Sequence, residues 1–117
     1  MGKLLVLHKI MLPKKYRVAK KDIPDIVKKG KRFSTEFFDV KVWYEDLKEN
    51  KFGVIIPKKV AKNATTRNRI KRIFRSAIFS LENENKFKSG KYIFLVKNQS
   101  IAEKKSQEIE GLIKDIF

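Results

Sequence analysis

The sequence predicts one domain of the α+β class, with a three- or four-stranded mixed sheet and about three helices packed on it. Hydrophobic residues make up 42% of the 117 residues, which is enough apolar material for a core. Apolar residues alternate along some segments and recur at helical spacing along others. No repeat or linker of low complexity divides the chain. These three observations favour helices packed on a single small sheet.

The first predicted helix covers residues 22–30. Asp22 can cap its N-terminus, and Gly30 stands where a helix commonly ends. Its apolar stripe consists of Ile23, Ile26 and Val27.

Residues 33–44 are predicted to form one strand, because apolar side chains alternate from Phe38 to Tyr44. A second strand is predicted over 52–57, where Pro57 ends it. The turn between the two strands is short, so we expect them to pair antiparallel.

The longest predicted helix runs from 64 to 81, with Asn63 or Thr65 as its cap. The positions expected to face the core are Ile70, Ile73, Phe74, Ala77, Ile78 and Leu81. The apolar run 91–97 is typical of a central strand covered on both faces. A capping box at 100–103 is expected to open a last helix with an apolar side at Ile109, Leu112, Ile113 and Ile116.

The charge of the chain indicates a polyanionic partner. Lys and Arg number 29 against 13 Asp and Glu, a formal net charge of +16. So large a charge costs stability through self-repulsion, and nucleic acid is the usual reason to carry it. A membrane surface is the second choice and a basic protein without such a partner the third. There is no cysteine and no apolar run of membrane-spanning length, which favours a cytoplasmic protein.

Residues 1–11 are interpreted as a flexible N-terminal arm and residues 12–117 as the single domain. The arm is interrupted by Lys3, His8 and Lys9 and has no cleavage site of a signal peptide. The natural start is either Met1 or Met11.

One stretch of the chain combines strong positive charge with helical spacing. No acidic residue lies between Lys58 and Leu81. On the helix, Arg67, Lys71, Arg75, Asn68, Arg72 and Arg69 sweep an arc of about 200°, and the apolar residues fill the rest. We expect the basic side chains to be exposed and to bind phosphates, and Asn68 to hydrogen-bond to a base, a ribose or a neighbouring Arg. The alternative is a solvated helix face.

The triplet Arg-Asn-Arg at 67–69, with Lys58-Lys59-Val60 before it, resembles the RNR signature of the bacterial ribonuclease P protein subunit. The segments 12–18, 22–30 and 92–96 and the final helix resemble the same family, so the likeness covers about 12–117. It implies a left-handed strand–helix–strand crossover through the RNR helix. It also implies a catalytic RNA partner, whose magnesium ions cleave the 5′ leader from precursor tRNA.

The resemblance assigns two sets of residues. The RNA-binding set is Lys58, Lys59, Lys62, Arg67, Asn68, Arg69, Lys71, Arg72 and Arg75. The leader is expected in a cleft between the first helix and the sheet, with candidates Arg17, Ile23, Val27, Phe33, Phe37, Lys41 and Trp43. Family members usually carry aromatic side chains where this chain has Ile23, Val27 and Lys41, which puts a base-stacking platform in doubt.

No protein side chain is predicted to be a chemical catalyst. The one histidine is His8, and the acidic residues stand in local pairs that capping or solubility explains. We therefore expect no catalytic residue and no cofactor bound by side chains, with magnesium required by the partner RNA. No stable protein partner and no membrane are expected. The alternative function is that of a ribosomal or chaperone-type RNA-binding protein without a role in processing.

Overall fold

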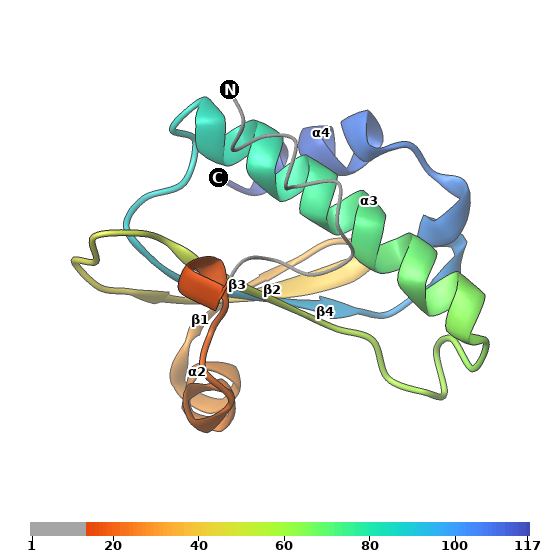
Figure 1. The fold of residues 1–117 in the computed structure, drawn as a ribbon, viewed down its shortest axis with the longest axis horizontal. Coiled ribbons are helices and arrows are strands. Elements are labelled where there is room, and N and C mark those ends of the chain that lie inside the picture. The colour runs from red at the N-terminus through yellow and green to blue at the C-terminus, as the bar shows by residue number, and fades with distance from the viewer. Residues whose placement is uncertain (1–13) are drawn as a thin grey trace.

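The computed structural model describes residues 14–117, in which a four-stranded sheet lies between one helix on one face and two on the other (Figure 1). The strands are β1 (Lys31–Ser34), β2 (Phe38–Tyr44), β3 (Lys51–Ile55) and β4 (Gly90–Val96). The helices are α2 (Ile23–Lys29), α3 (Ala64–Asn83) and α4 (Ser106–Ile116). Three 3₁₀ segments join them: η1 (Lys14–Tyr16), η2 (Lys20–Asp22) and η3 (Gln99–Glu103). The predicted α+β class is confirmed, and the predicted arm at 1–11 lies outside the described residues.

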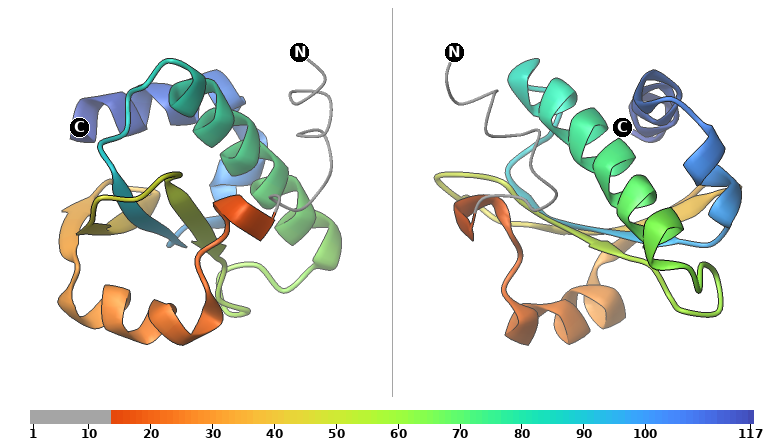
Figure 2. Two further views of the ribbon diagram at one scale, coloured as in Figure 1. Left: turned by 60° about the vertical axis from the view of Figure 1, so that its left-hand side comes forward. Right: turned by 45° about the vertical axis from the view of Figure 1, so that its right-hand side comes forward.

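The strand order is β1-β2-β4-β3. β4 pairs antiparallel with β2 and parallel with β3, with Phe94 opposite both Val40 and Val54. The prediction that the segment 52–57 pairs antiparallel with the preceding strand is therefore wrong. β4 carries the longest apolar run and takes the centre, which leaves β3 at the edge and makes α3 the crossover between parallel neighbours (Figure 2).

The predicted strand 33–44 is in fact a hairpin of β1 and β2, with Phe33 opposite Val40. The Thr35 hydroxyl makes the turn: it accepts from the backbone N–H of Phe37 and Phe38 and donates to the carbonyl of Phe38. Local hydrogen bonds of this kind compete with a continuing strand.

The core has two parts, one on each face of the sheet. The main core, between the sheet and α3 and α4, includes Phe38, Val40, Val42, Phe94, Ile70, Phe74, Ile78, Ile109 and Ile113. A smaller core lies under α2 and includes Val18, Ile26 and Ile93, with Ile23, Val27, Ile55 and Leu95 partly buried around it. β4 is thus covered on both faces, as its apolar run predicted. Ile73 is only half-buried, because it stands about 80° around α3 from the centre of the buried residues.

The helix ends follow the sequence in part. The Asn63 side chain accepts a hydrogen bond from the backbone N–H of Thr65, which confirms the predicted cap of α3. The Asp22 side chain makes no cap bond, and instead forms an ion pair with Lys91 at 3.2 Å. The predicted capping box at 100–103 is wrong: that segment is η3, and α4 begins at Ser106. The Lys105 N–H donates to the Glu108 carboxylate there.

Candidate nucleic-acid interface

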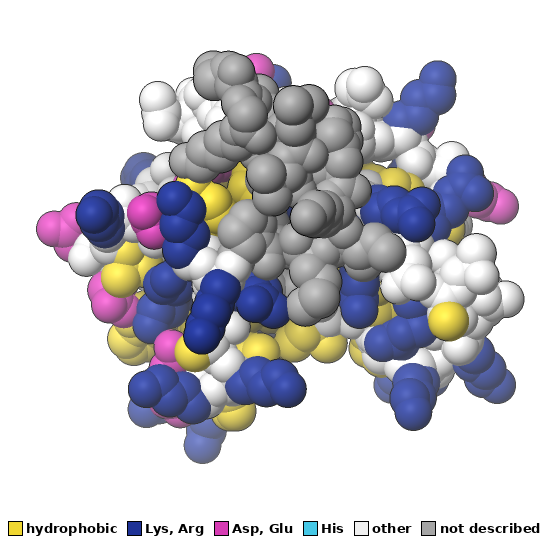
Figure 3. Space-filling view, in the orientation of Figure 1, with side chains coloured by type: hydrophobic (Ala, Val, Ile, Leu, Met, Phe, Trp, Pro, Cys, Tyr) yellow, Lys and Arg dark blue, Asp and Glu magenta, His cyan; other side chains and the backbone are white. Residues whose placement is uncertain are grey.

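Lysines and arginines gather where β3 passes into α3. Lys58, Lys59 and Lys62 are exposed on the connecting loop, and Arg69 and Arg72 are exposed on the helix. Asn68 beside them is half-buried, and so is Lys71, which contradicts the predicted exposure of Lys71. In the space-filling view, basic side chains surround the start of α3, whereas acidic side chains are few and lie toward the margins (Figure 3). Loop and helix therefore form one basic surface.

The backbone at the start of α3 adds to this surface. The first turn contains no acidic residue, although the positive end of the helix dipole favours one. The cations there face no compensating charge on their own turn. An incoming phosphate would supply the missing negative charge, which is why this end of α3 is suited to a polyanion.

Arg67 is half-buried, which contradicts its predicted exposure. Its Nη1 donates to the carbonyl of Ile56 at 2.6 Å and to that of Ala61 at 3.3 Å. The helical spacing explains the turn inward: Arg67 precedes Ile70 by three residues and Phe74 by seven, so it lies on the same side of α3 as the core.

Arg75 is buried, with 3% of its surface exposed, so the prediction that it is exposed is wrong. The flank of α3 that holds Arg75 is buried, and Phe79 on the same flank is 6% exposed. Phe79, one turn later on this flank, packs edge-on against Tyr16 of η1, with ring centroids 5.7 Å apart. Burial lowers the pKa of Arg75 to about 10, and the charge of Arg72 adds to that shift.

The other predicted set of residues, that of the leader cleft, is divided by the sheet. Ile23 and Val27 of α2 and Lys41 and Trp43 of β2 lie on the α2 side. Arg17 is exposed and forms a bridge to Phe52 at the edge.

Phe33 and Phe37 lie elsewhere, because both pack on the main core. Phe33 contacts Phe117, and the Lys104 ammonium lies 4.2 Å from the centroid of the Phe37 ring. The two phenylalanines therefore do not join Trp43 on the α2 side, where Trp43 is 41% exposed.

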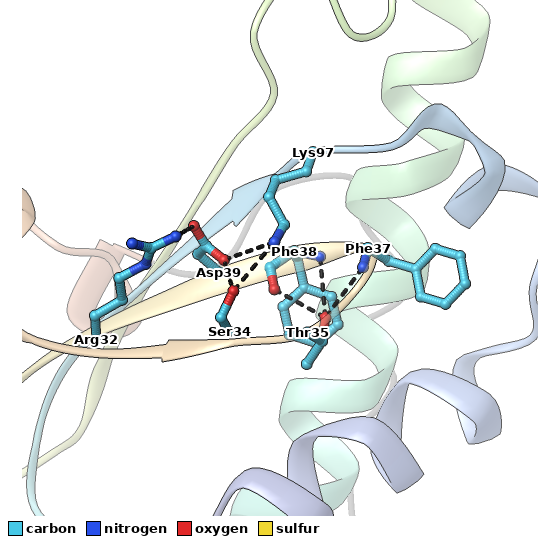
Figure 4. A network of polar contacts seen from close by, with 7 residues as sticks. All are labelled: Arg32, Ser34, Thr35, Phe37, Phe38, Asp39 and Lys97. Atoms are coloured by element: carbon cyan, nitrogen blue, oxygen red, sulfur yellow. Dashed lines mark hydrogen bonds and ion pairs between the residues drawn. The ribbon is translucent and has the colours of Figure 1, made fainter.

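The α2 side of the sheet also holds a polar network that the sequence analysis missed (Figure 4). The Asp39 carboxylate accepts hydrogen bonds from Arg32 at 3.1 Å and from Ser34, and pairs with Lys97 at 2.9 Å. Partial burial acts to raise the pKa of Asp39, but the hydrogen bonds from Ser34 and Lys97 and the charges of Lys97 and Arg32 outweigh it and lower the pKa below 3.8. The network joins β1, β2 and β4 and fixes two cations on this face.

The pairing register was the signal needed to find this network. Asp39 stands opposite Ser34 in β1 and opposite Leu95 in β4, two residues before Lys97. Only strand pairing brings these residues together, and the sequence did not predict the β1–β2 hairpin.

Within residues 14–117, no three His, Cys, Asp or Glu side chains are grouped so that they could hold a metal ion. None of the helices in this part of the chain has the length and apolar character needed to cross a membrane.

Comparisons with known proteins agree on one family. Residues 12–117 match the family Ribonuclease P. A ribonuclease P protein component from Bacillus cereus is 32% identical over 110 residues, which cover 92% of this chain and 90% of that protein. One from Syntrophus aciditrophicus is 34% identical over 91 residues, covering 77% of this chain and 74% of that protein.

Solved structures of low identity support the fold. The RNase P protein of Staphylococcus aureus is 22% identical, with a TM-score of 0.71, and the match covers 86% of this chain and 91% of that one. The RNase P protein from Thermotoga maritima is 20% identical, with a TM-score of 0.69, and the match covers 86% of this chain and 94% of that one.

Proposed function

Because this chain belongs to the ribonuclease P protein family and is the protein subunit of that tRNA-processing endoribonuclease, we propose how its surfaces divide the work. The basic surface formed by the loop before α3 and the first turns of α3 binds the catalytic RNA. The α2 side of the sheet binds the single-stranded 5′ leader of precursor tRNA. Membership of the family implies an RNA partner, and the catalytic RNA and the precursor tRNA are the partners that we assign.

The observation that carries the proposal is the continuity of exposed cations from Lys58 to Arg72. They share one end of the molecule with the positive end of a 20-residue helix. Arg offers forked donors that match phosphate oxygens, and Lys a mobile point charge. Such a surface recognises a folded RNA through its backbone, which is the contact a subunit needs to hold a structured partner.

The α2 side suits a flexible single strand held mainly by charge. Its partly buried aliphatic residues are Ile23, Val27, Ile55 and Leu95, and its cations include Lys41, Lys97 and Arg32. Trp43 can stack on a base at one end, which is worth about 1–3 kcal/mol per base. We therefore expect little discrimination between leader sequences and a strong dependence on salt.

We assign the chemistry to the RNA and its magnesium ions. The side chains described here orient and neutralise: they supply fixed positive charge beside the substrate backbone and no nucleophile or general base. The protein alone is then expected to cleave nothing. We also propose a cytoplasmic location, where bacterial tRNA transcripts are made and processed.

Reconstitution tests the proposal. The protein is added to a bacterial ribonuclease P RNA at low magnesium, and the cleavage rate of precursor tRNA is measured. We expect the wild-type protein to raise the rate. Arg69→Ala and Arg72→Ala should each weaken binding and lower the slope of log affinity against log salt by about 0.7–0.9, while stability changes by less than about 0.5 kcal/mol.

Asp46→Asn serves as the control, because Asp46 is exposed in the turn before β3, away from the basic surface. A wild-type protein that binds many RNAs equally and leaves cleavage unchanged would instead indicate a ribosomal or chaperone-type RNA-binding protein. Cleavage by the protein without RNA would contradict the assignment of the chemistry.

A further inference from the structure

We propose that Arg67 is a positioning residue of the RNA interface, which acts through the three lysines of the β3–α3 loop. The inference rests on the proposed function, because it concerns how the same basic surface is built. It separates Arg67 from Arg69 and Arg72, whose side chains point into solvent.

The Arg67 guanidinium donates hydrogen bonds to two backbone carbonyls. Nη1 of Arg67 donates to the carbonyls of Ile56 and Ala61, at 2.6 and 3.3 Å. Ile56 directly follows the last residue of β3, and Ala61 lies three residues before α3 begins. One side chain therefore joins the strand, the loop and the helix.

The two residues whose carbonyls accept these hydrogen bonds are buried. Ile56 is 4% exposed and Ala61 1% exposed, so their backbone has little access to water. A buried carbonyl that loses its donor is costly, and the loop would move to regain one. The Arg67 guanidinium therefore determines where this part of the backbone lies.

The loop between those two carbonyls is held in a turn by its own backbone. The N–H groups of Val60 and Ala61 both donate to the carbonyl of Pro57, which closes a tight turn. The turn presents Lys58, Lys59 and Lys62, all exposed. Arg67 joins this turn to the start of α3, the helix that carries Arg69 and Arg72.

Electrostatic repulsion acts on this loop. The lysines of the loop repel one another and the arginines of α3, and no acidic residue lies in the segment to offset this. A loop released from Arg67 would spread its charges into solvent. Binding the RNA would then require the loop to be ordered again, which lowers affinity.

The test is a double-mutant cycle, in which the affinity for a bacterial ribonuclease P RNA transcript and its salt dependence are measured. Arg67→Met removes the donors and keeps the length of the side chain. Lys58→Gln, Lys59→Gln and Lys62→Gln together remove the charges of the loop. Arg72→Met is the matched control on the same helix. Hydrogen exchange at the amides of Val60 and Ala61 reports the order of the loop directly.

We expect Arg67→Met to weaken RNA binding on the order of tenfold and to lower the salt slope by about 2–3, the share of three phosphate contacts. Exchange at Val60 and Ala61 should become faster. In the triple-Gln background, Arg67→Met should have no further effect, whereas Arg72→Met should keep its full effect, with a slope change of about 0.9.

Two results would overturn the proposal. If Arg67→Met lowers the slope by a single contact and adds fully to the triple-Gln variant, Arg67 itself binds a phosphate. If RNA affinity is unchanged, Arg67 has no role in the interface.

Arg67→Gln replaces Arg67→Met if that variant does not fold. If neither folds, Arg67 supports the whole domain, and the proposal is also overturned. A wild-type protein that does not bind the RNA would instead count against the proposed function.

Discussion

The Asp39 carboxylate of β2 contacts Arg32 and Ser34 of β1 and Lys97, which directly follows β4. The ionisation of this single residue leads to a prediction about stability. The pKa of Asp39 is lowered in the fold, so the unfolded chain takes up a proton at this group first as the pH falls. The stability that the ionised group contributes is therefore present above pH 3.8 and is lost as the pH falls through the lower pKa of the folded state. Asp39→Asn should cost about 1 kcal/mol near neutral pH.

Urea unfolding of wild type and Asp39→Asn over a series of pH values measures this difference. It should shrink as the pH falls below 3.8. Asp46→Asn removes an exposed acid of the same type and controls for the change in net charge. A difference between wild type and Asp39→Asn that stays constant down to the acid limit would show that the carboxylate is not stabilised in the fold.

The exposure of single residues shows which parts of the site could be predicted from the sequence. Charge and spacing predicted Lys58, Lys59, Lys62, Arg69 and Arg72 on the surface, and they are there. The same argument failed for Arg67 and Arg75, because helical spacing alone does not show which segments pack against the start of a helix or against its flank. The carbonyl of Ile56, just after β3, accepts a hydrogen bond from Arg67, and Arg75 lies on the buried flank of α3 where Phe79 packs on Tyr16 of η1. Neither arrangement follows from the spacing of residues within α3.

The packing of α3 gives a prediction at the scale of the element. Ile70 is fully buried in the centre of the helix face, whereas Ile73 is half-buried at its edge. Ile70→Ala should cost about 2–5 kcal/mol, because it removes apolar contact and leaves a cavity. Ile73→Ala should cost less, about 1–2 kcal/mol. Urea unfolding measures both, and equal losses would mean that α3 is rotated relative to its position here.

Two glycines, Gly111 inside α4 and Gly30 just after α2, give a second comparison. A Cβ at Gly111 in α4 meets nothing within 4 Å, whereas one at Gly30 would lie 2.4 Å from the carbonyl oxygen of Ile26. Gly111→Ala should therefore raise the free energy of unfolding by about 1 kcal/mol through helix propensity. Gly30→Ala should lower it by more than about 1 kcal/mol, because backbone must shift.

Thermal unfolding of the two alanine variants provides the check, and each is the other's control for the added methyl group. A stable Gly30→Ala variant would indicate that the end of α2 can move away from Val42, whose carbonyl oxygen lies 3.1 Å from the added Cβ.

The elements show why the sequence predicted the parts better than their arrangement. Alternation and helical spacing located β2, α3 and β4, since these depend on neighbouring residues. The partner of β3 is β4, which lies more than 30 residues further along the chain. A short turn after β2 suggested a hairpin, but the more apolar β4 occupies the place beside β2. Local sequence does not contain that competition.

The whole molecule carries a formal net charge of +16, which gives a prediction about stability in the absence of RNA. Raising NaCl from about 0.01 to 0.15 M shortens the screening length from about 30 to 8 Å. The melting temperature of the free protein should therefore rise, because repulsion is screened. RNA should raise it further and most strongly at low salt, where binding is tightest. Calorimetry in NaCl would contradict this if the temperature fell.

The position of β3 beside β4 has a consequence for the birth of the chain. β3 ends at Ile55, and β4, its neighbour in the sheet, is completed at Val96, with all of α3 made in between. At about 5–20 residues per second, a ribosome needs on the order of 2–8 seconds to cover that distance. During this delay the β1–β2 hairpin can close, whereas β3 has, among the described residues already made, only the bridge from Phe52 to Arg17. β3 therefore joins β4 only after β4 is made, and the basic helix is synthesised before the central strand on which it packs.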